Sequence, residues 1–176
     1  MNVLLFSGGA DSSLIFLNLI DKVDFKCIFL DYGQESLQEE YSSASSLCSK
    51  FGIELEAIQV DIKSKYNDFY IAGRNLFLVG LAATRCCEGE SIYLGVNKSD
   101  EEAFPDCRVG FITALKTSLA FGYGVKLETP LLALTKREIL QNLAKLNYTK
   151  YSYCYSPKEG KPCGNCLSCL THRESL

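Results

Sequence analysis

A glycine-rich turn between two apolar runs constrains the fold more than any other stretch of the chain. Residues 7–13 read SGGADSS, directly after the strand-like run 3–6 and before the helix-like run 14–20. Strand, glycine-rich turn and helix in this order present free backbone N–H groups to a phosphate. An ordinary strand-to-helix turn uses the same residue types, but the full SGGxDS spacing directly after a strand favours a phosphate-binding loop.

The spacing of this turn excludes two common nucleotide-binding motifs. It is neither the GxxxxGK[ST] loop of kinase-like nucleotidases nor the GxGxxG fingerprint of dinucleotide-binding folds. Asp11 would repel a phosphate, so we expect it to order the loop, cap the helix or hold Mg²⁺. The predicted phosphate-binding residues are Phe6, Ser7, Gly8, Gly9, Ala10, Asp11, Ser12 and Ser13.

Length and composition fit one domain of an ordinary globular protein. The chain has 176 residues, 47% hydrophobic and 22% charged, which is enough for a single core. With a formal charge of −3 and no basic block, nothing predicts direct nucleic-acid binding. No apolar run reaches the roughly 18 residues of a membrane span, and Met1 leads straight into a strand-like run without a leader pattern. We therefore expect a cytoplasmic protein with reduced cysteines.

Strand-like and helix-like segments alternate along the chain. Strands are predicted at residues 3–6, 23–30, 53–60, 90–96 and 125–127, and helices between and after them. This alternation predicts an α/β fold with an open, mostly parallel five-stranded sheet and helices on both faces. Polar groups at the carboxyl ends of such strands contact ligands, which indicates Asp31, Tyr32, Gly33, Gln34, Gly95 and Asn97.

The C-terminal segment has a different character and four clustered cysteines. Cys154, Cys163, Cys166 and Cys169 follow the spacing C-x8-C-x2-C-x2-C. Four thiolates at this spacing suit a tetrahedral Zn²⁺, with an iron–sulfur cluster or two disulfides as alternatives. We expect residues 1–147 to form the α/β domain that carries the phosphate-binding loop, and residues 148–176 to form a small zinc segment packed on it.

Several motifs together resemble one family. They are SGGxDS at 7–12, DYGQ at 31–34, GRN at 73–75, GVN at 95–97, PDCR at 105–108, TPL at 129–131, LTK at 134–136 and the four-cysteine tail. From about residue 2 to about residue 173 the chain is similar to the 7-cyano-7-deazaguanine synthases of queuosine biosynthesis. These belong to the PP-loop ATP pyrophosphatases, with an adenine-nucleotide α-hydrolase-like fold. The resemblance implies a homodimer that uses ATP, Mg²⁺ and ammonia to convert 7-carboxy-7-deazaguanine, through an adenylate and the amide, into the nitrile. It also implies a structural Zn²⁺ on the four cysteines.

The resemblance and the chemistry together nominate catalytic residues. Adenylation needs cations near phosphate and carboxylate, which we assign to Arg74, Arg108 and Lys136 beside Asp11 of the loop. Each cation has a simpler alternative as a solvated charge at a helix end. The fifth candidate is Asp106, which either accepts hydrogen bonds from the guanine-like edge of the substrate or caps its helix. The single histidine, His172, is expected at the surface.

Two departures from the family pattern leave other functions open. Glu35-Ser36 stands where the family has Arg-His, and Asp61 and Gly73 are only twelve positions apart. An enzyme that stops at the amide, or transfers the activated carboxylate to another amine, including one on a protein, is therefore an alternative. A non-catalytic zinc-stabilised binding module is a second alternative. Adenylating enzymes that modify tRNA are disfavoured by the weak basic character of the chain.

Overall fold

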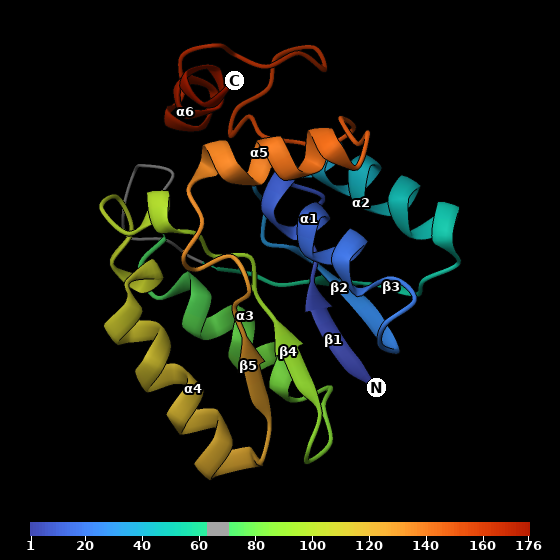
Figure 1. Ribbon diagram of the computed structural model, residues 1–176, viewed down its shortest axis with the longest axis vertical. Coiled ribbons are helices and arrows are strands. Elements are labelled where there is room, and N and C mark those ends of the chain that lie inside the picture. Colours follow the sequence, from blue (N-terminus) through green and yellow to red (C-terminus); the bar gives the residue numbers. More distant parts are fainter. Residues whose placement is uncertain (63–70) are drawn as a thin grey trace.

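The centre of the molecule is a five-stranded, all-parallel sheet (Figure 1). The computed structural model describes residues 1–62 and 71–176. The strand order is β3-β2-β1-β4-β5, with β1 at Asn2–Leu5, β2 at Phe25–Asp31, β3 at Leu55–Gln59, β4 at Ser91–Tyr93 and β5 at Lys126–Glu128. In register, Leu4 of β1 lies opposite Cys27 on one side and Tyr93 on the other. The predicted parallel α/β fold is confirmed.

Helices cover both faces of the sheet because β1 is apolar on both of its sides. Leu4 and Phe6 pack with α1 (Ala10–Leu19), α2 (Leu37–Phe51) and α5 (Lys136–Lys145). Val3 and Leu5 point the opposite way and pack with α3 (Arg74–Ala83) and α4 (Val109–Tyr123). A strand that is buried on both faces reads as a continuous apolar run, which is why residues 3–6 identify it.

The order of the strands creates a crevice at the carboxyl edge of the sheet. The chain passes from β1 to β2 and β3 on one side and then crosses to β4 on the other side of β1. Loops leaving β1 and β4 therefore diverge, which is where open α/β sheets bind ligands. Figure 1 shows α5 and the C-terminal segment lying over this edge.

The observed elements differ from the predicted ones at three places. Pro105–Cys107 forms a separate 3₁₀ turn instead of opening the next helix, because Arg108 has extended backbone (φ −67°, ψ 144°) and α4 begins at Val109. A second 3₁₀ turn covers Lys98–Asp100. A helix that was not predicted, α6 (Leu167–Ser175), packs against α5. Most of the short connection between Asp61 and Gly73 lies outside the described residues.

Local sequence signals explain where two of the helices stop and start. Gly52 ends α2 in the left-handed conformation (φ 67°), and Thr135 and Glu138 form a reciprocal capping box at the start of α5. Within residues 1–62 and 71–176, no helix has the length and apolar character needed to cross a bilayer.

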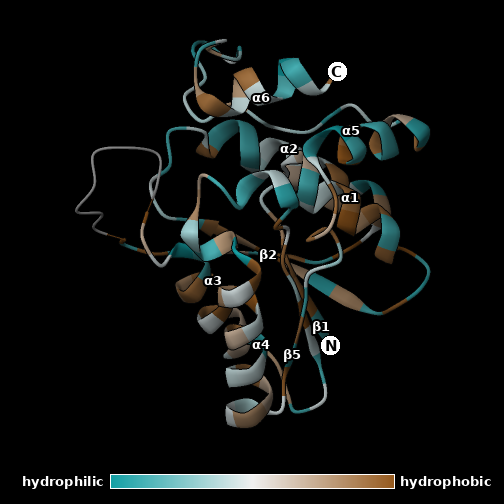
Figure 2. Cartoon of the chain, turned by 60° about the vertical axis from the view of Figure 1, so that its left-hand side comes forward, coloured by the Kyte–Doolittle hydropathy of each residue, from teal (hydrophilic) through white to brown (hydrophobic). Residues whose placement is uncertain are grey.

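Helix α4 differs from the other surface helices in its outer face. Figure 2 shows neutral and hydrophobic colours around α4, whereas α5 carries a hydrophilic outer side. Val109, Phe121 and Tyr123 are exposed, and Lys116 is the single charged residue in the fifteen residues of α4. A surface helix normally has a charged outer stripe, so this face is suited to contact with another protein surface.

Candidate active site

A cavity of about 400 Å³ opens at the carboxyl edge of the sheet. Its walls come from the glycine-rich turn, the ends of β1, β2 and β4, the first turns of α3 and α5, and the C-terminal segment. We call it the carboxyl-edge cavity. Its predicted site residues are Phe6, Ser7, Gly9, Ala10, Asp11, Ser12, Tyr32, Arg74, Gly95 and Lys136.

The glycine-rich turn is held in place from two sides. Gly8 has φ +72°, and a Cβ there would lie 2.5 Å from the carbonyl oxygen of Glu40 and 2.7 Å from the amide nitrogen of Ala44. The Gly8 carbonyl oxygen accepts hydrogen bonds from the Ser43 hydroxyl at 2.8 Å and from the Ser152 backbone N–H at 2.9 Å. The loop is thus clamped between α2 and the C-terminal segment.

The start of α1 supplies N–H groups for an anion. Gly9 is the N-cap of α1, and no side chain caps this helix end. The first-turn N–H groups of a helix have no intrahelical partners and carry the positive end of the helix dipole. The Ser7 and Ser12 hydroxyls lie 3.2 Å apart beside them. This is the arrangement expected of a phosphate-binding turn.

Asp11 takes part in a charged network at one wall of the cavity. The Lys136 ammonium lies 2.7 Å from both carboxylate oxygens of Asp11. The buried Asn97 amide donates to Asp11 at 3.3 Å and to Asp100 at 2.6 Å. Burial, and next the charge of Asp11, raise the pKa of Asp100 to about 6. Burial opposes the charged form of Lys136, but Asp11 and Asp100 outweigh it and its pKa is raised, so Lys136 is a cation.

Another part of the cavity wall carries a second charged group, beside the carboxyl end of β2. The Arg74 guanidinium donates to the Tyr32 hydroxyl at 3.4 Å. Glu40 of α2 also lines the cavity, and burial raises the pKa of its carboxyl. Its oxygens accept from the Ser36 hydroxyl at 2.8 Å and from the Gln34 side-chain amide at 3.1 Å. This wall therefore combines a guanidinium with a carboxylate.

Eight other predicted site residues do not line the cavity. Gly8, Ser13, Asp31, Gly33, Gln34, Asn97, Asp106 and Arg108 are not among its lining residues. The Asp31 carboxylate accepts from the Gly33 N–H at 3.0 Å, and Gln34 binds the Leu30 carbonyl and the Tyr32 N–H. These bonds fix the turn that carries Tyr32 into the cavity.

Asp106 packs beside α3, whereas Arg108 lies at the surface. The buried Asp106 carboxylate accepts from the Asn75 N–H at 3.1 Å, and its backbone carbonyl accepts from the Asn75 side chain at 3.1 Å. Asp106 thus holds the first turn of α3, next to Arg74, and not the start of its own helix. Arg108 is exposed and donates to the Glu101 carbonyl oxygen at 3.4 Å.

The C-terminal segment closes the cavity with aromatic rings. The His172 imidazole stacks on Tyr153 with centroids 3.9 Å apart and an interplanar angle of 3°. Its Nε2 lies 3.1 Å from the Tyr151 hydroxyl. His172, which was expected at the surface, is partly buried and lines the cavity. The reason is α6, which turns this residue inward.

Four cysteines of the same segment converge on one point. The sulfur atoms of Cys154, Cys163, Cys166 and Cys169 all lie within 4.8 Å of one another. The sulfurs of Cys163 and Cys169 are 3.9 Å apart, close to the edge of about 3.8 Å in a tetrahedron with Zn–S bonds of about 2.3 Å. These four residues can hold a metal ion. All nine cysteines are free, so the disulfide alternative is not observed.

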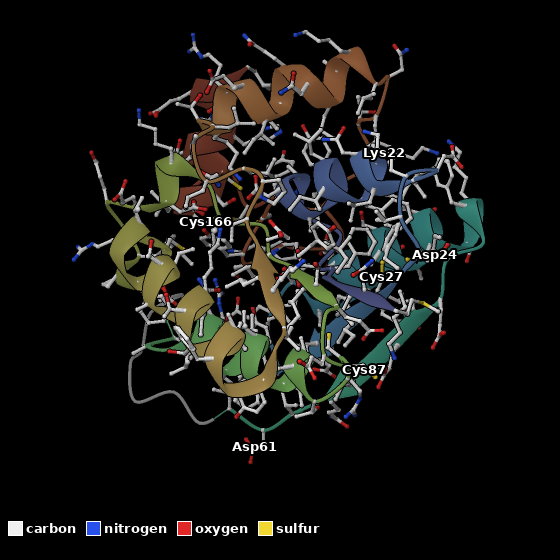
Figure 3. The ribbon with its side chains drawn as sticks, turned by 60° about the horizontal axis from the view of Figure 1, so that its bottom comes forward. Lys22, Asp24, Cys27, Asp61, Cys87 and Cys166 are labelled. Carbon is white, nitrogen blue, oxygen red and sulfur yellow. The ribbon has the colours of Figure 1, made fainter. Side chains whose placement is uncertain are left out.

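Backbone N–H groups donate hydrogen bonds to sulfurs of this cluster, although burial raises the pKa of the Cys154 and Cys169 thiols. The Cys163 N–H donates to Cys154 at 3.2 Å, and the Cys166 N–H donates to Cys163 at 3.4 Å. The N–H groups of Asn165 and Cys166 lower the pKa of the Cys163 thiol to about 6. Figure 3 shows Cys27 and Cys87 well apart from Cys166, so they lie outside the cluster.

Comparison with known proteins identifies the family. The profile described as "Queuosine biosynthesis protein QueC" matches residues 1–69 and 63–176. The chain belongs to the QueC family. Relatives named 7-cyano-7-deazaguanine synthase include proteins from Leptospira interrogans (30% identical, 99% of this chain and 85% of that protein) and Prochlorococcus marinus (34%, 95% and 89%). A third, from Methanocaldococcus jannaschii, is 27% identical over 99% of this chain and 93% of its own length.

One solved structure resembles this QueC-family chain in fold. It is described as a predicted subunit of tRNA methyltransferase from Methanocaldococcus jannaschii, with a TM-score of 0.55 and 22% identity. The match covers 82% of this chain and 74% of that one. At this identity the likeness supports the α/β fold alone.

Several cavity residues of this QueC-family chain were not predicted from the sequence. They are Glu40, Asp100, Tyr153, Tyr155 and His172. Three of them lie on the C-terminal segment, which reaches the cavity only because it folds back over the carboxyl edge. The DYGQ motif stops six residues before Glu40, but a carboxylate one helical turn after the N-cap Ser36 was a signal that could have been followed.

Proposed function

We propose that the protein is an ATP-dependent ligase that adenylates 7-carboxy-7-deazaguanine. With ammonia it would convert the acid, through the amide, into 7-cyano-7-deazaguanine, and release AMP and pyrophosphate. The observation that carries the proposal is a single cavity lined by an uncapped helix start, Lys136 and Arg74 in a QueC-family chain.

In this proposal the glycine-rich turn and Lys136 bind the phosphates of ATP. The N–H groups at the start of α1, with the Ser7 and Ser12 hydroxyls, hold the pyrophosphate end. Lys136 neutralises charge that develops as pyrophosphate leaves. Asp11 and Asp100, which converge on Asn97, are the hard oxygen donors present for the Mg²⁺ that accompanies ATP and offsets its charge.

Arg74 binds the second reactant. A carboxylate is a poor electrophile, so the acid must be held in line with the α-phosphorus until AMP has been transferred to it. Arg74 lines the same cavity as the loop and can pair with the carboxylate of the substrate. Asp106 acts as a positioning residue, because it fixes the first turn of α3 through Asn75. Arg108 is exposed, and we assign it no role in the reaction.

Zinc on the four cysteines would stabilise the C-terminal segment. The cluster has the separations and N–H donors of a tetrathiolate site, and the segment buries few other side chains. A structural zinc contributes roughly 10–16 kcal/mol of apparent binding free energy. That is comparable to the roughly 5–15 kcal/mol net stability of a whole domain.

A second candidate is an enzyme that stops at the amide or delivers the activated acid to a larger amine, including one on a protein. A second cavity of about 700 Å³ lies between α2 and the C-terminal segment. Ser152 and Tyr153 line both cavities, so a thin wall separates them. The departures at residues 35 and 36 do not line the carboxyl-edge cavity: Glu35 contacts Ser156, and Ser36 bonds to Glu40.

We further propose a homodimer in the cytoplasm. The exposed, nearly uncharged outer face of α4, with Val109, Phe121 and Tyr123, supports an interface between two copies. Equilibrium ultracentrifugation tests this state, and Phe121→Glu should shift the protein to monomers if α4 forms the interface.

One experiment separates these functions. The zinc-loaded protein is incubated with ATP and 7-carboxy-7-deazaguanine, with and without ammonium, and AMP, pyrophosphate and the deazaguanine products are quantified by mass spectrometry. AMP formation that requires the acid, followed by nitrile when ammonium is present, is the expected result. Amide without nitrile would favour the second candidate, and the absence of AMP would leave only a binding module. Gly9→Val, which fills the space beside Ser7, is the inactive control.

A further inference from the structure

Glu40 presents a carboxylate to the carboxyl-edge cavity. The residue lies in the first turns of α2, and its backbone carbonyl oxygen lies against Gly8 of the loop. The side chain is partly buried and lines the cavity together with Tyr32 and Arg74. A carboxylate in a site that must receive anionic reactants is unfavourable unless it binds donors on the ligand.

The carboxylate of Glu40 is oriented but not saturated by the residues that the structure describes. One oxygen accepts from the Ser36 hydroxyl at 2.8 Å, and the other accepts from the Gln34 amide at 3.1 Å. An ionised carboxylate offers about four acceptor sites, so about two remain. Both side-chain partners come from the β2–α2 connection, which leaves the cavity side of the carboxylate for a ligand with two N–H donors.

The other carboxylates around the cavity differ from Glu40 in their hydrogen-bond partners or in their exposure to solvent. Asp11 is paired with Lys136 through both oxygens, and Asp100 accepts from Asn97 at 2.6 Å. Asp106, the residue we predicted for the guanine-like edge, lies behind the first turn of α3 and does not line the cavity. Glu102 lines the cavity but is exposed to solvent. Glu40 is the carboxylate whose position and remaining acceptor sites suit a ligand.

We infer that Glu40 binds the N1–H and 2-amino groups of the deazaguanine ring and so selects a guanine-type substrate. This inference rests on the proposed function, because it takes the ring from the proposed substrate. Adjacent N1–H and 2-amino donors match the two oxygens of one carboxylate. Arg74 on the same wall then meets the neighbouring ring oxygen and the 7-carboxylate, which lie side by side on the ring. Glu40 would thus accept from the two donors of the ring and Arg74 would donate to its two acceptors, in the order in which these groups follow one another along the ring.

The test measures binding selectivity. Dissociation constants are measured by calorimetry, without ATP, for 7-carboxy-7-deazaguanine and for its analogue that lacks the 2-amino group. One hydrogen bond to a charged group is worth between about tenfold and about a hundredfold in affinity, so the wild-type protein should prefer the amino compound by that factor. Glu40→Gln should reduce the preference to within about threefold, because an amide has one acceptor and brings a donor against the ring.

The matched control is Glu39→Gln, a neighbouring glutamate of α2 that faces the second cavity and should keep the wild-type preference. A wild-type ratio near one, no binding of either compound, or full preference in Glu40→Gln would overturn the inference. If Glu40→Gln does not fold, Ser36→Ala removes one bond that orients the carboxylate and should lower the preference several-fold. AMP formation is assayed separately: intact selectivity without AMP contradicts the proposed ligase and leaves the inference standing.

Discussion

Replacing Gly8 by alanine should damage the loop for two reasons that can be measured apart. A residue with a Cβ at φ +72° incurs roughly 1–2 kcal/mol of backbone strain. The Cβ would also lie 2.5 Å and 2.7 Å from backbone atoms of Glu40 and Ala44, which cannot rotate away. Overpacking of this kind costs about 1–3 kcal/mol. The expected loss is therefore about 2–5 kcal/mol, a large share of the roughly 5–15 kcal/mol stability of a domain.

Gly33→Ala is the control that isolates the contact. Gly33 has φ +79°, but a Cβ there would have nothing within 4 Å, so this substitution carries the backbone strain alone. Urea unfolding of both variants at equal zinc concentration should place the Gly8→Ala midpoint lower by about 0.5–1.5 M, for a slope of about 2 kcal/mol/M. Equal midpoints with equal slopes would refute the close approach of α2 to the loop.

Three further predictions concern the metal, a lysine and a buried acid. Cys163→Ser should lower the zinc content by elemental analysis and lower the melting temperature, because three thiolates bind the ion less tightly than four. Lys136→Met should raise the KM for ATP at least tenfold in a steady-state AMP assay, since it leaves Asp11 unpaired beside the phosphates. The carboxyl of Asp100 has a pKa of about 6 in the folded state, above its unfolded value near 4. Between these two pH values the native state therefore keeps a proton that the unfolded state has lost. The residue therefore disfavours folding progressively as pH rises from about 4 to about 6. Asp100→Asn should gain stability relative to wild type across that window, on the order of 1–3 kcal/mol in paired urea titrations, and then level off.

The parts of the fold that sequence reasoning predicted are those fixed by local patterns. The run at residues 3–6 identifies β1 because both faces of that strand are buried, and the Thr135–Glu138 capping box marks the start of α5. Helix α6 gave no such signal. Its single buried residue is Cys169, its N-cap is the sulfur of Cys166, and it is covered by packing on α5. Neither the cap nor the packing partner is visible in a hydrophobic pattern.

The residues of the candidate site show the same difference between local sequence patterns and tertiary packing. Six of the eight residues predicted for the phosphate-binding turn line the cavity, because strand, turn and helix are contiguous. Asp106 shows the limit: two local roles were considered, and the contact that forms is with Asn75, thirty-one positions earlier in the chain. His172 and Glu40 reach the cavity through the path of α6 and the direction of α2, which depend on tertiary packing.

The hydrogen bond from Ser152 to the Gly8 carbonyl joins the cysteine-bearing segment to the glycine-rich turn. In the proposed function, a metal that orders this segment lowers the entropy that the turn must lose when it binds ATP. Thermodynamic linkage makes such an effect reciprocal: if the metal tightens ATP binding by some factor, ATP tightens metal binding by the same factor. ATP should accordingly protect the protein from a chelator, and Ser152→Pro, which removes the N–H, should abolish that protection.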